Sequence, residues 1–505
     1  MLVEKHRPDV AAGADDTLIE RVDALCRDVF VPIVQGWSDH EKTCRPLIEA
    51  MADAGLFGLT LPKAYGGAGG SDQYSSVLCA LRERFGYHEA LIDTQFAIQC
   101  LGTNAILRMG SDDQHGRYLP GLVTGKTLFS FALSEPHSGS DVLGMRTRAA
   151  REGDGWVLNG SKMFISGAPD ADVYITFAKT GDESDRRAIT AFLIETGTPG
   201  FTARGGIHLQ APHAIGYLDF DNCRVSDAQR LGEIGEGLRA SLGTLEIFRP
   251  SVGSATLGMA AKALDLAIDF SKSREAFGGH LSDLPGLRLK LGRMAALIAG
   301  GQGLVQRAAA LRDSGQSTVV EGAVAKAWST EASIEVIYEA QQIHGGRGVI
   351  VGQEIEMLSR AVRPTTIYEG ASEVQRSIIG KAEVRRLRKG EGSRSGIESD
   401  GAVGALLRTT RTTYDAWLAA SQDLWESPAF HVRLAESLMA IEAAECATAA
   451  SDAIRRFLAL AAARVLAGDI ARTGGRVPTA DLARAAASGG SEDELALQIA
   501  AAALA

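Results

Sequence analysis

The chain has 505 residues, of which 45% are hydrophobic and 23% charged, ordinary values for a globular protein large enough for more than one domain. Its formal net charge of -10 argues against a nucleic-acid-binding protein, because neutralising phosphates requires a surplus of Lys and Arg. The N-terminus, MLVEKHRPDV, lacks the apolar stretch of a signal peptide, and no apolar run approaches the roughly 20 residues that cross a bilayer.

The first third of the chain has a helical pattern. Apolar residues recur at three- and four-residue spacing in four segments, 16–35, 45–54, 74–85 and 95–109. A proline and a glycine cluster in LPKAYGGAGG, residues 61–70, interrupt this pattern and predict a loop. We therefore expect an N-terminal helical domain over residues 1–127.

The pattern changes near residue 128. Arg146–Arg151 and Trp156–Leu158 flank a Gly-Asp-Gly turn, as the strands of an antiparallel hairpin would. Short β-like runs follow at 173–179, 188–194 and 217–221. The frequent turn signals predict a small β-domain, barrel- or sandwich-like, over residues 128–233.

The helical period returns after the β-like region. Long helix-like segments occupy 236–248, 250–273, 282–313, 318–344 and 371–387. Their length is typical of a bundle, and we expect a four-helix bundle over residues 234–388. Because helical and β-like regions are segregated rather than alternating, the predicted fold class is α+β, mostly α.

A polar, glycine-rich stretch follows the bundle. KGEGSRSGIESDG, residues 389–401, predicts a linker over 389–402, and the alanine-rich segment 403–505 predicts a helical extension. Within the extension, segment 453–473 places apolar residues on one helical face and arginines elsewhere. A helix packed on protein is the preferred interpretation of this pattern, and a helix lying on a membrane surface is the alternative.

Several kinds of site have no signature in the sequence. The six cysteines and ten histidines show no metal-ligand spacing, so no metal site is expected. The cysteines also lack a disulfide framework, which favours a reducing compartment and a cytoplasmic protein. No Rossmann fingerprint, phosphate-binding loop or nucleophile elbow is present.

Three segments concentrate unusual residues: FALSEPHSGSD at 131–141, LNGSKMFISGAPDAD at 158–172 and RPTTIYEGASEVQR at 363–376. The first offers serine hydroxyls to a polar ligand, with an ordinary turn as the alternative. In the second, Phe164 alternates with Ser166 along a strand and can face a planar ligand, with a core phenylalanine as the alternative.

The third segment places Glu369 between Tyr368 and Gly370. A carboxylate beside an aromatic residue in a tight turn can be desolvated, which raises its pKa towards that of a working base. The alternative is an acid that caps the helix after it.

Taken together, six motifs in order resemble the acyl-CoA dehydrogenase family over residues 16–387. They are LPKAYGGAGG, SEPHSGSD, KMFISGAPDAD, SREAFGGHL, QIHGGRG and IYEGASEVQR. The resemblance implies an N-terminal helical domain, a central β-domain and a C-terminal four-helix bundle, with FAD bound between the last two and reached by a neighbouring subunit.

The resemblance also implies the cofactor contacts. Ser134 and Ser166 should hydrogen-bond the flavin ring, with Ser166 near N5, and Phe131 and Phe164 should lie beside the ring. Arg274 and Phe277 should reach the FAD of the partner subunit. Arg274 is suited to the pyrophosphate group of that FAD by its charge and its fork geometry. The remaining cofactor positions carried over are Gln342, Gly345, Gly346 and Glu373.

By the same resemblance, Glu369 removes the α-proton of an acyl-CoA thioester while the β-hydride passes to flavin N5, giving a trans-2-enoyl thioester. The backbone N–H of Glu369 and a ribityl hydroxyl of FAD would stabilise the thioester oxygen. The substrate positions are Ser140, Glu246, Arg249, Tyr368 and Gly370. Some relatives place the base just before Arg249, where this chain has Phe248, which cannot act.

Four departures from the family pattern leave open whether the acyl group is carried by CoA or by an acyl-carrier protein. They are Phe164 for a tryptophan, Ala371 for a threonine, His137 for a glycine, and an unusual segment at 205–216. The alternatives are an acyl-carrier-protein thioester as substrate and an oxygen-using flavin oxidase or monooxygenase. A non-catalytic flavoprotein is disfavoured by the negative net charge of the chain and by the presence of a candidate base, Glu369. Electron-transfer flavoprotein is the expected acceptor, and a homodimer or homotetramer the expected assembly.

Overall fold

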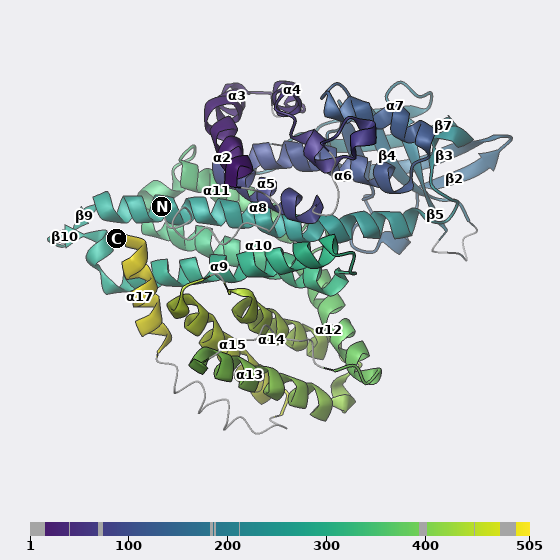
Figure 1. The fold of residues 1–505 in the computed structure, drawn as a ribbon. Helices are drawn as coiled ribbons and strands as arrows, with labels where there is room; N and C mark the ends of the chain where they lie inside the picture. Colours follow the sequence, from purple (N-terminus) through teal and green to yellow (C-terminus); the bar gives the residue numbers. More distant parts are fainter. Residues whose placement is uncertain are drawn as a thin grey trace. The chain divides into compact units, whose positions relative to one another are not determined.

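The computed structural model describes residues 16–39, 41–68, 74–181, 185, 188–211, 213–392, 401–448, 450–474 and 491–504. These residues form two compact units. The mixed unit comprises Asp16–Leu78 and His88–Phe248, and the helical unit comprises Cys79–Tyr87 and the described part of Arg249–Ala505. Figure 1 shows the mixed unit in purple to blue and most of the helical unit in teal to yellow. The fold is α+β and mostly helical, as predicted.

The N-terminal helices confirm the predicted helical start. They are α2 (Asp16–Leu25), α3 (Val31–Gly36), α4 (Arg45–Asp53), α5 (Tyr74–His88), α6 (Ala90–Met109) and α7 (Asp112–Val123). A π-helical turn, Cys26–Phe30, joins α2 to α3. Helix α7 was not predicted, although Ser111 and Gln114 form a reciprocal capping box at its start, a signal that the sequence contained.

The mixed unit also contains an eight-stranded sheet. Its strands are β1 (Phe129–Ala132), β2 (Arg148–Glu152), β3 (Gly155–Ser166), β4 (Val173–Lys179), β5 (Ile189–Glu195), β6 (Phe201–Arg204), β7 (Ile215–Ser226) and β8 (Arg230–Leu231). The order is β6-β7-β3-β2-β4-β5-β8, with β1 beside β4. The predicted hairpin is confirmed, because Ala149 faces Leu158 across β2 and β3. Strands β4 and β5 are buried along almost their whole length.

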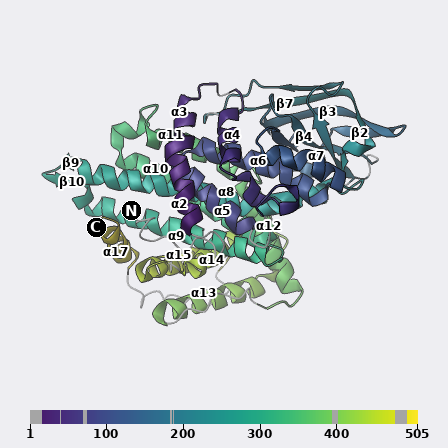
Figure 2. The ribbon, with the colours of Figure 1, turned by 45° about the horizontal axis from the view of Figure 1, so that its top comes forward.

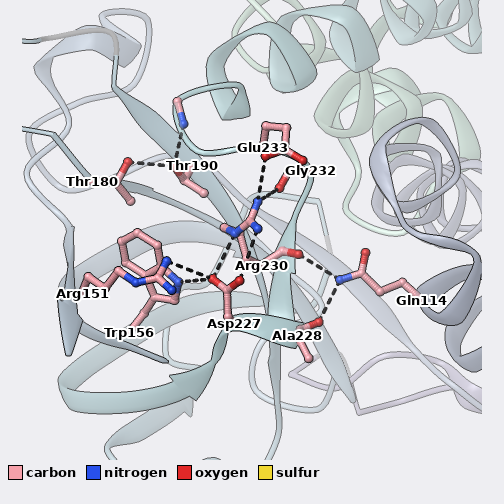
Figure 3. Close-up of polar contacts among 11 residues, drawn as sticks. Gln114, Arg151, Trp156, Thr180, Thr190, Asp227, Ala228, Arg230, Gly232 and Glu233 are labelled. Atoms are coloured by element: carbon pink, nitrogen blue, oxygen red, sulfur yellow. Dashed lines mark hydrogen bonds and ion pairs between the residues drawn. The ribbon is translucent and has the colours of Figure 1, made fainter. Parts of the chain in front are cut away.

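A polar cluster joins α7 to the edge of this sheet (Figure 3). Asp227 Oδ1 accepts hydrogen bonds from Trp156 Nε1 at 2.8 Å and Arg230 Nε at 3.1 Å. These bonds, first that from Arg230 and then that from Trp156, lower the pKa of Asp227 to about 2. Gln114 Nε2 donates to the carbonyl oxygens of Ala228 and Arg230, both at 2.9 Å. The cluster therefore fixes the helix against the sheet.

Most of the helical unit is made of long helices. They are α8 (Gly237–Ser273), whose first twelve residues belong to the mixed unit, α9 (Pro285–Asp313), α10 (Val319–Ile343), α11 (Glu354–Val362) and α12 (Ser372–Arg388). The predicted break near residue 249 is wrong, because α8 runs through Pro250. Phe248 and Val252 on either side are fully buried, and this burial offsets the roughly 3 kcal/mol that an internal proline costs a helix.

The predicted extension is helical in its described part. It contains α13 (Gly401–Ala420), α14 (Pro428–Cys446), α15 (Asp452–Arg472) and α17 (Glu492–Leu504). Helices α14 and α17 pack against α9, and α15 packs against α13 and α14 (Figures 1 and 2). Ile454, Phe457 and Leu458 on α15 are buried within the unit, as the packed-helix interpretation expects.

Glycines bring the extension close to the bundle. A Cβ atom at Gly292 of α9 would lie 1.9 Å from the carbonyl oxygen of Ala496, and one at Gly303 would lie 2.2 Å from that of Cys446. On α12, a Cβ at Gly380 would lie 2.3 Å from the carbonyl oxygen of His431. The helices of the extension therefore rest directly on the backbone of the bundle.

Buried charges are paired within the extension and between it and α12. Arg411 of α13 donates from Nε to Glu445 Oε1 of α14 at 3.1 Å, and its Nη2 donates to the other carboxylate oxygen. Arg386 of α12 donates to Asp415 of α13 at 2.7 Å. Arg411 and Glu445 are each less than a tenth exposed, so the two helices meet around an ion pair removed from water.

Other predictions concern single features. All six cysteines are free and buried. Along the part of the chain described above, no helix combines the length and the hydropathy needed to cross a membrane. Residues 69–70 of the predicted loop and 393–400 of the predicted linker lie outside the described residues. The predicted domain boundaries stay predictions.

Candidate active site

Unusual backbone conformations coincide with the predicted site. Among the described residues, the non-glycine residues with positive φ are Phe164 (60°), Asn222 (50°), Phe277 (54°) and Glu369 (51°). A non-glycine residue with this backbone conformation is strained by about 1–3 kcal/mol. Such a conformation persists only where the surrounding structure enforces it, which is common at functional sites. Three of these four residues are ones that the family resemblance names.

Glu369 lies in a tight turn between the 3₁₀-helix Arg363–Thr366 and α12. The residue after it, Gly370, has φ of 99°, and a Cβ there would lie 2.1 Å from Gln375 Nε2 and 3.9 Å from Arg249 Nε. The turn therefore needs glycine on grounds of both conformation and space. The structure thus brings the predicted substrate residues Gly370 and Arg249 together.

Two buried side chains hold this turn by hydrogen bonds to its backbone. The carbonyl oxygen of Gly370 accepts hydrogen bonds from Lys326 Nζ at 2.8 Å and from Gln375 Nε2 at 2.9 Å. Both side chains are shielded from solvent. Burial lowers the pKa of Lys326 to about 8, although the Glu369 carboxylate raises it in part. The ammonium group therefore stays largely charged at neutral pH.

Lys326 and Gln375 were missed by the sequence analysis. A lysine in the otherwise apolar helical stretch GAVAKAW, residues 322–328, was the available signal, because a buried lysine requires a specific partner. Gln375 lies in the IYEGASEVQR motif, six residues after Glu369. Its contact with the turn follows from the first turn of α12, which brings its side chain back over Gly370.

The predicted cofactor residues of the helical unit are exposed. Arg274 precedes the hairpin of β9 (Glu275–Ala276) and β10 (Gly279–His280), and Phe277 at its tip is 91% exposed. This hairpin projects from the end of α8 in Figure 1. Gly345 and Gly346, near the end of α10, have no atom within 4 Å of an added Cβ. Gln342 and Glu373 are exposed, and Tyr368 is 40% exposed.

In the mixed unit, Phe131 lies on β1 and packs against Phe177, with ring centroids 5.0 Å apart. Ser134 follows β1, and its carbonyl oxygen accepts from the backbone N–H of Met163 at 3.0 Å. The predicted alternation of Phe164 with Ser166 along a regular strand is wrong, because a β-bulge in β3 shifts the register at Phe164. The bulge leaves Phe164 54% exposed.

The segment SEPHSGSD is held by a buried ion pair. Lys162 Nζ donates to Glu135 Oε1 at 2.8 Å, and both side chains are almost fully buried. Glu135 also accepts from the backbone N–H groups of Arg146 at 2.6 Å and Thr147 at 3.0 Å. Although burial alone would raise the pKa of Glu135, Lys162 and these donors lower it overall. This pair was not predicted from the sequence.

The serines of this segment differ in role. Ser138 is buried and its hydroxyl donates to the carbonyl oxygen of Asp141. Ser140 is exposed and Ser134 is half-buried.

The site positions on α8 differ in exposure. Phe248 is fully buried, Glu246 is half-buried and Arg249 is 7% exposed.

Ser166 has a partner that the sequence analysis did not identify. His213 Nε2 lies 2.8 Å from Ser166 Oγ, and His213 belongs to the unusual segment 205–216. Burial lowers the pKa of His213 from 6.5 to about 4. The imidazole is therefore neutral at neutral pH.

This shift predicts an acid-sensitive contribution to stability. The unfolded chain takes up a proton at this histidine near pH 6.5 but the folded chain only near pH 4, so acidification in this window favours unfolding by about 1.4 kcal/mol per pH unit. Between pH 7 and pH 5, the wild type should lose about 2 kcal/mol more than His213→Gln, measured by urea unfolding at both pH values. Equal losses in the two proteins would contradict the assignment.

Within the described ranges, no group of His, Cys, Asp and Glu side chains is arranged to hold a metal ion.

Comparison with known proteins identifies the family. Profiles described as acyl-CoA dehydrogenase N-terminal, middle and C-terminal domains match residues 14–126, 130–223 and 235–384. An acyl-CoA dehydrogenase of Bacillus subtilis (strain 168) is 38% identical over 338 residues, 66% of this chain and 88% of the relative. The caffeyl-CoA reductase-Etf complex subunit CarC of Acetobacterium woodii is 34% identical, over 66% of this chain and 88% of that protein. The chain belongs to the acyl-CoA dehydrogenase family, whose members are FAD-dependent oxidoreductases.

The extension is also represented among solved structures. An acyl-CoA dehydrogenase from Bacillus anthracis, complexed with FAD, has a TM-score of 0.84 and covers 99% of this chain and 95% of its own. At 22% identity this likeness shows the fold alone. The fold with additional C-terminal helices therefore also occurs in that protein.

Proposed function

We propose that this protein is an FAD-dependent dehydrogenase that desaturates an acyl thioester between its α and β carbons, with Glu369 as the base. The observation that carries the proposal is the turn at Glu369. A carboxylate residue is held at positive φ, and the carbonyl oxygen of the following residue, Gly370, is fixed by two buried donors. A turn enforced in this way positions the carboxylate without a rearrangement during the reaction.

The chain's own groups account for the proton. Glu369 accepts the α-proton, and its backbone N–H donates to the thioester oxygen as negative charge develops there. When bound, FAD supplies the acceptor for the β-hydride. Arg249 and Lys326 place positive charge near the Glu369 turn, which favours the ionised, proton-accepting form of the carboxylate. Tyr368, 40% exposed beside the base, is proposed to line the acyl pocket.

Features of each unit fit a planar cofactor. In the mixed unit these are the exposed ring of Phe164, the ring of Phe131, and the polar groups of Ser134 and Ser166. In the helical unit, open space at Gly345 and Gly346 permits close approach of a ligand to the backbone. The other proposed FAD contacts are Arg274, Phe277, Gln342 and Glu373. The proposed substrate contacts are Ser140, Glu246, Arg249 and Gly370.

We also propose a homodimer or homotetramer that passes electrons to an electron-transfer flavoprotein. The oligomer is supported by exposed apolar side chains in the helical unit, where Phe277 is 91%, Val351 83% and Val349 70% exposed. The acceptor is supported by the name of the Acetobacterium woodii relative, a subunit of an Etf complex. Light scattering during size-exclusion chromatography tests the assembly.

The proposed reaction is tested directly with the purified protein and FAD. Anaerobic mixing with a panel of acyl-CoA thioesters of different chain lengths should bleach the flavin absorbance with at least one of them. Bleaching by an acyl-carrier-protein thioester but by no CoA ester would instead identify the carrier protein as substrate. A protein that binds no FAD would refute the proposal.

A second prediction concerns Lys326. Replacement by methionine removes one donor to the Gly370 carbonyl oxygen and a nearby positive charge, and should lower the maximal rate of flavin bleaching about 10²-fold. Lys290→Met, which removes a lysine on α9 paired with Glu339, is the matched control and should leave the rate unchanged.

A purely structural role would not alter the pH dependence of the rate. Because Lys326 favours ionised Glu369, Lys326→Met should also move the acidic limb of the pH–rate profile to higher pH. A wild-type rate and profile in this variant would contradict the assigned role.

A further inference from the structure

Ser166 is fixed in position on three sides. It ends β3 opposite Ile215 of β7, and its carbonyl oxygen accepts from Ser130 Oγ at 2.6 Å. The next backbone N–H, of Gly167, donates to the carbonyl oxygen of Ala214 at 2.9 Å. The backbone of Ser166 is thereby held by neighbours from β1 and β7. With the backbone held, the polar group still to be oriented at this residue is its hydroxyl, whose hydrogen rotates to suit its partners.

His213 controls that rotation. Its Nε2 lies 2.8 Å from Ser166 Oγ, a hydrogen-bond distance, and its own position just before β7 is set by the pairing of β7 with β3. The other ring nitrogen, Nδ1, is shielded from solvent and has no hydrogen-bond partner among the described residues. Burial keeps the ring neutral at neutral pH, so it carries a single N–H.

The position of that N–H follows from the two nitrogens. On Nδ1 it would be a buried donor without an acceptor, which is unfavourable. On Nε2 it donates to Ser166 Oγ. This arrangement occupies a lone pair of the serine oxygen and leaves the hydroxyl hydrogen to be donated elsewhere.

We propose that His213 is a positioning residue that makes the Ser166 hydroxyl a hydrogen-bond donor towards a nitrogen acceptor of the bound flavin. The inference rests on the proposed function, because it takes Ser166 as a flavin contact. Oxidised flavin has a lone pair at N5 that accepts such a bond, whereas reduced flavin carries hydrogen there and cannot. His213 therefore favours the oxidised cofactor and lowers its reduction potential.

The test is a reductive titration of the FAD-loaded protein against a reference dye, which reports the flavin potential without turnover. His213→Ala should shift the potential to a more positive value, corresponding to about a five-fold change in the ratio of reduced to oxidised flavin affinity, as one hydrogen bond of ordinary strength implies. His213→Gln, which can present an N–H at a similar position, should restore most of the wild-type potential.

A double-mutant cycle separates this effect from a general disturbance. In a Ser166→Ala background, where the hydroxyl is absent, His213→Ala should cause no further shift. An equal shift with and without the hydroxyl, or no shift in His213→Ala alone, would overturn the inference while leaving the proposed function intact. A wild-type protein that binds no FAD would overturn both.

Discussion

Replacing Glu369 by glutamine should lower the rate of flavin bleaching by acyl thioester about 10⁴-fold, the upper end of what a positioned general base contributes. Glutamine has the same shape and can adopt the same turn, but its amide cannot take up the α-proton. The Gly370 carbonyl contacts with Lys326 and Gln375 do not involve the Glu369 side chain, so the fold of the turn should be kept. FAD binding should therefore persist, measured by the visible spectrum.

The matched control is Glu335→Gln. Glu335 lies on α10 in the same unit and pairs with Arg293 on the surface, so this change should leave the rate at the wild-type value. Stopped-flow absorbance under anaerobic conditions measures both variants with the same thioester. Bleaching by Glu369→Gln at the wild-type rate would place the base at another residue.

The largest expected effect on stability is that of Glu445→Ala. This change leaves the Arg411 guanidinium buried between α13 and α14 without its carboxylate partner, which should lower the free energy of unfolding by about 3–5 kcal/mol. The double variant Arg411→Met/Glu445→Leu should recover most of the loss, because it removes both charges from the interior. Chemical denaturation followed by circular dichroism measures all three proteins.

An exposed pair in the same unit supplies the control. Arg388 and Glu426 also form an ion pair, but both side chains are more than half exposed, so water screens the interaction. Glu426→Ala should leave the unfolding transition almost unchanged. If Glu445→Ala were no more destabilising than this control, the interface of α13 and α14 would not depend on the buried charges.

The sequence predicted the elements that depend on local pattern. The hairpin of β2 and β3 followed from the Gly-Asp-Gly turn between its two segments, and α9, α10 and α12 followed from their apolar period. The continuity of α8 through Pro250 could not be predicted in this way, because a local rule against internal proline is outweighed by burial on both sides. The bulge at Phe164 likewise arises from the pairing of β3 with β7.

The candidate site shows the same division. Glu369 was predicted from a motif in which all the residues are adjacent in sequence. Lys326 and Gly370 are 44 residues apart, and Ser166 and His213 are 47 apart, so these contacts exist only once helices and strands have packed. The resemblance to a family named the residues expected to contact ligand, but not the side chains that hold those residues in place.

The glycines beneath the extension limit how this architecture can be recombined. Gly292, Gly303 and Gly380 each lie where a single added carbon would collide with the backbone of a helix from residues 401–504. Alanine at these positions would place Cβ atoms 1.9–2.3 Å from backbone oxygens, whereas real Cβ atoms essentially never approach within 3.0 Å, so those helices would have to move outwards. Transplanting the extension onto a relative that lacks it therefore requires these three glycines to be transferred with it.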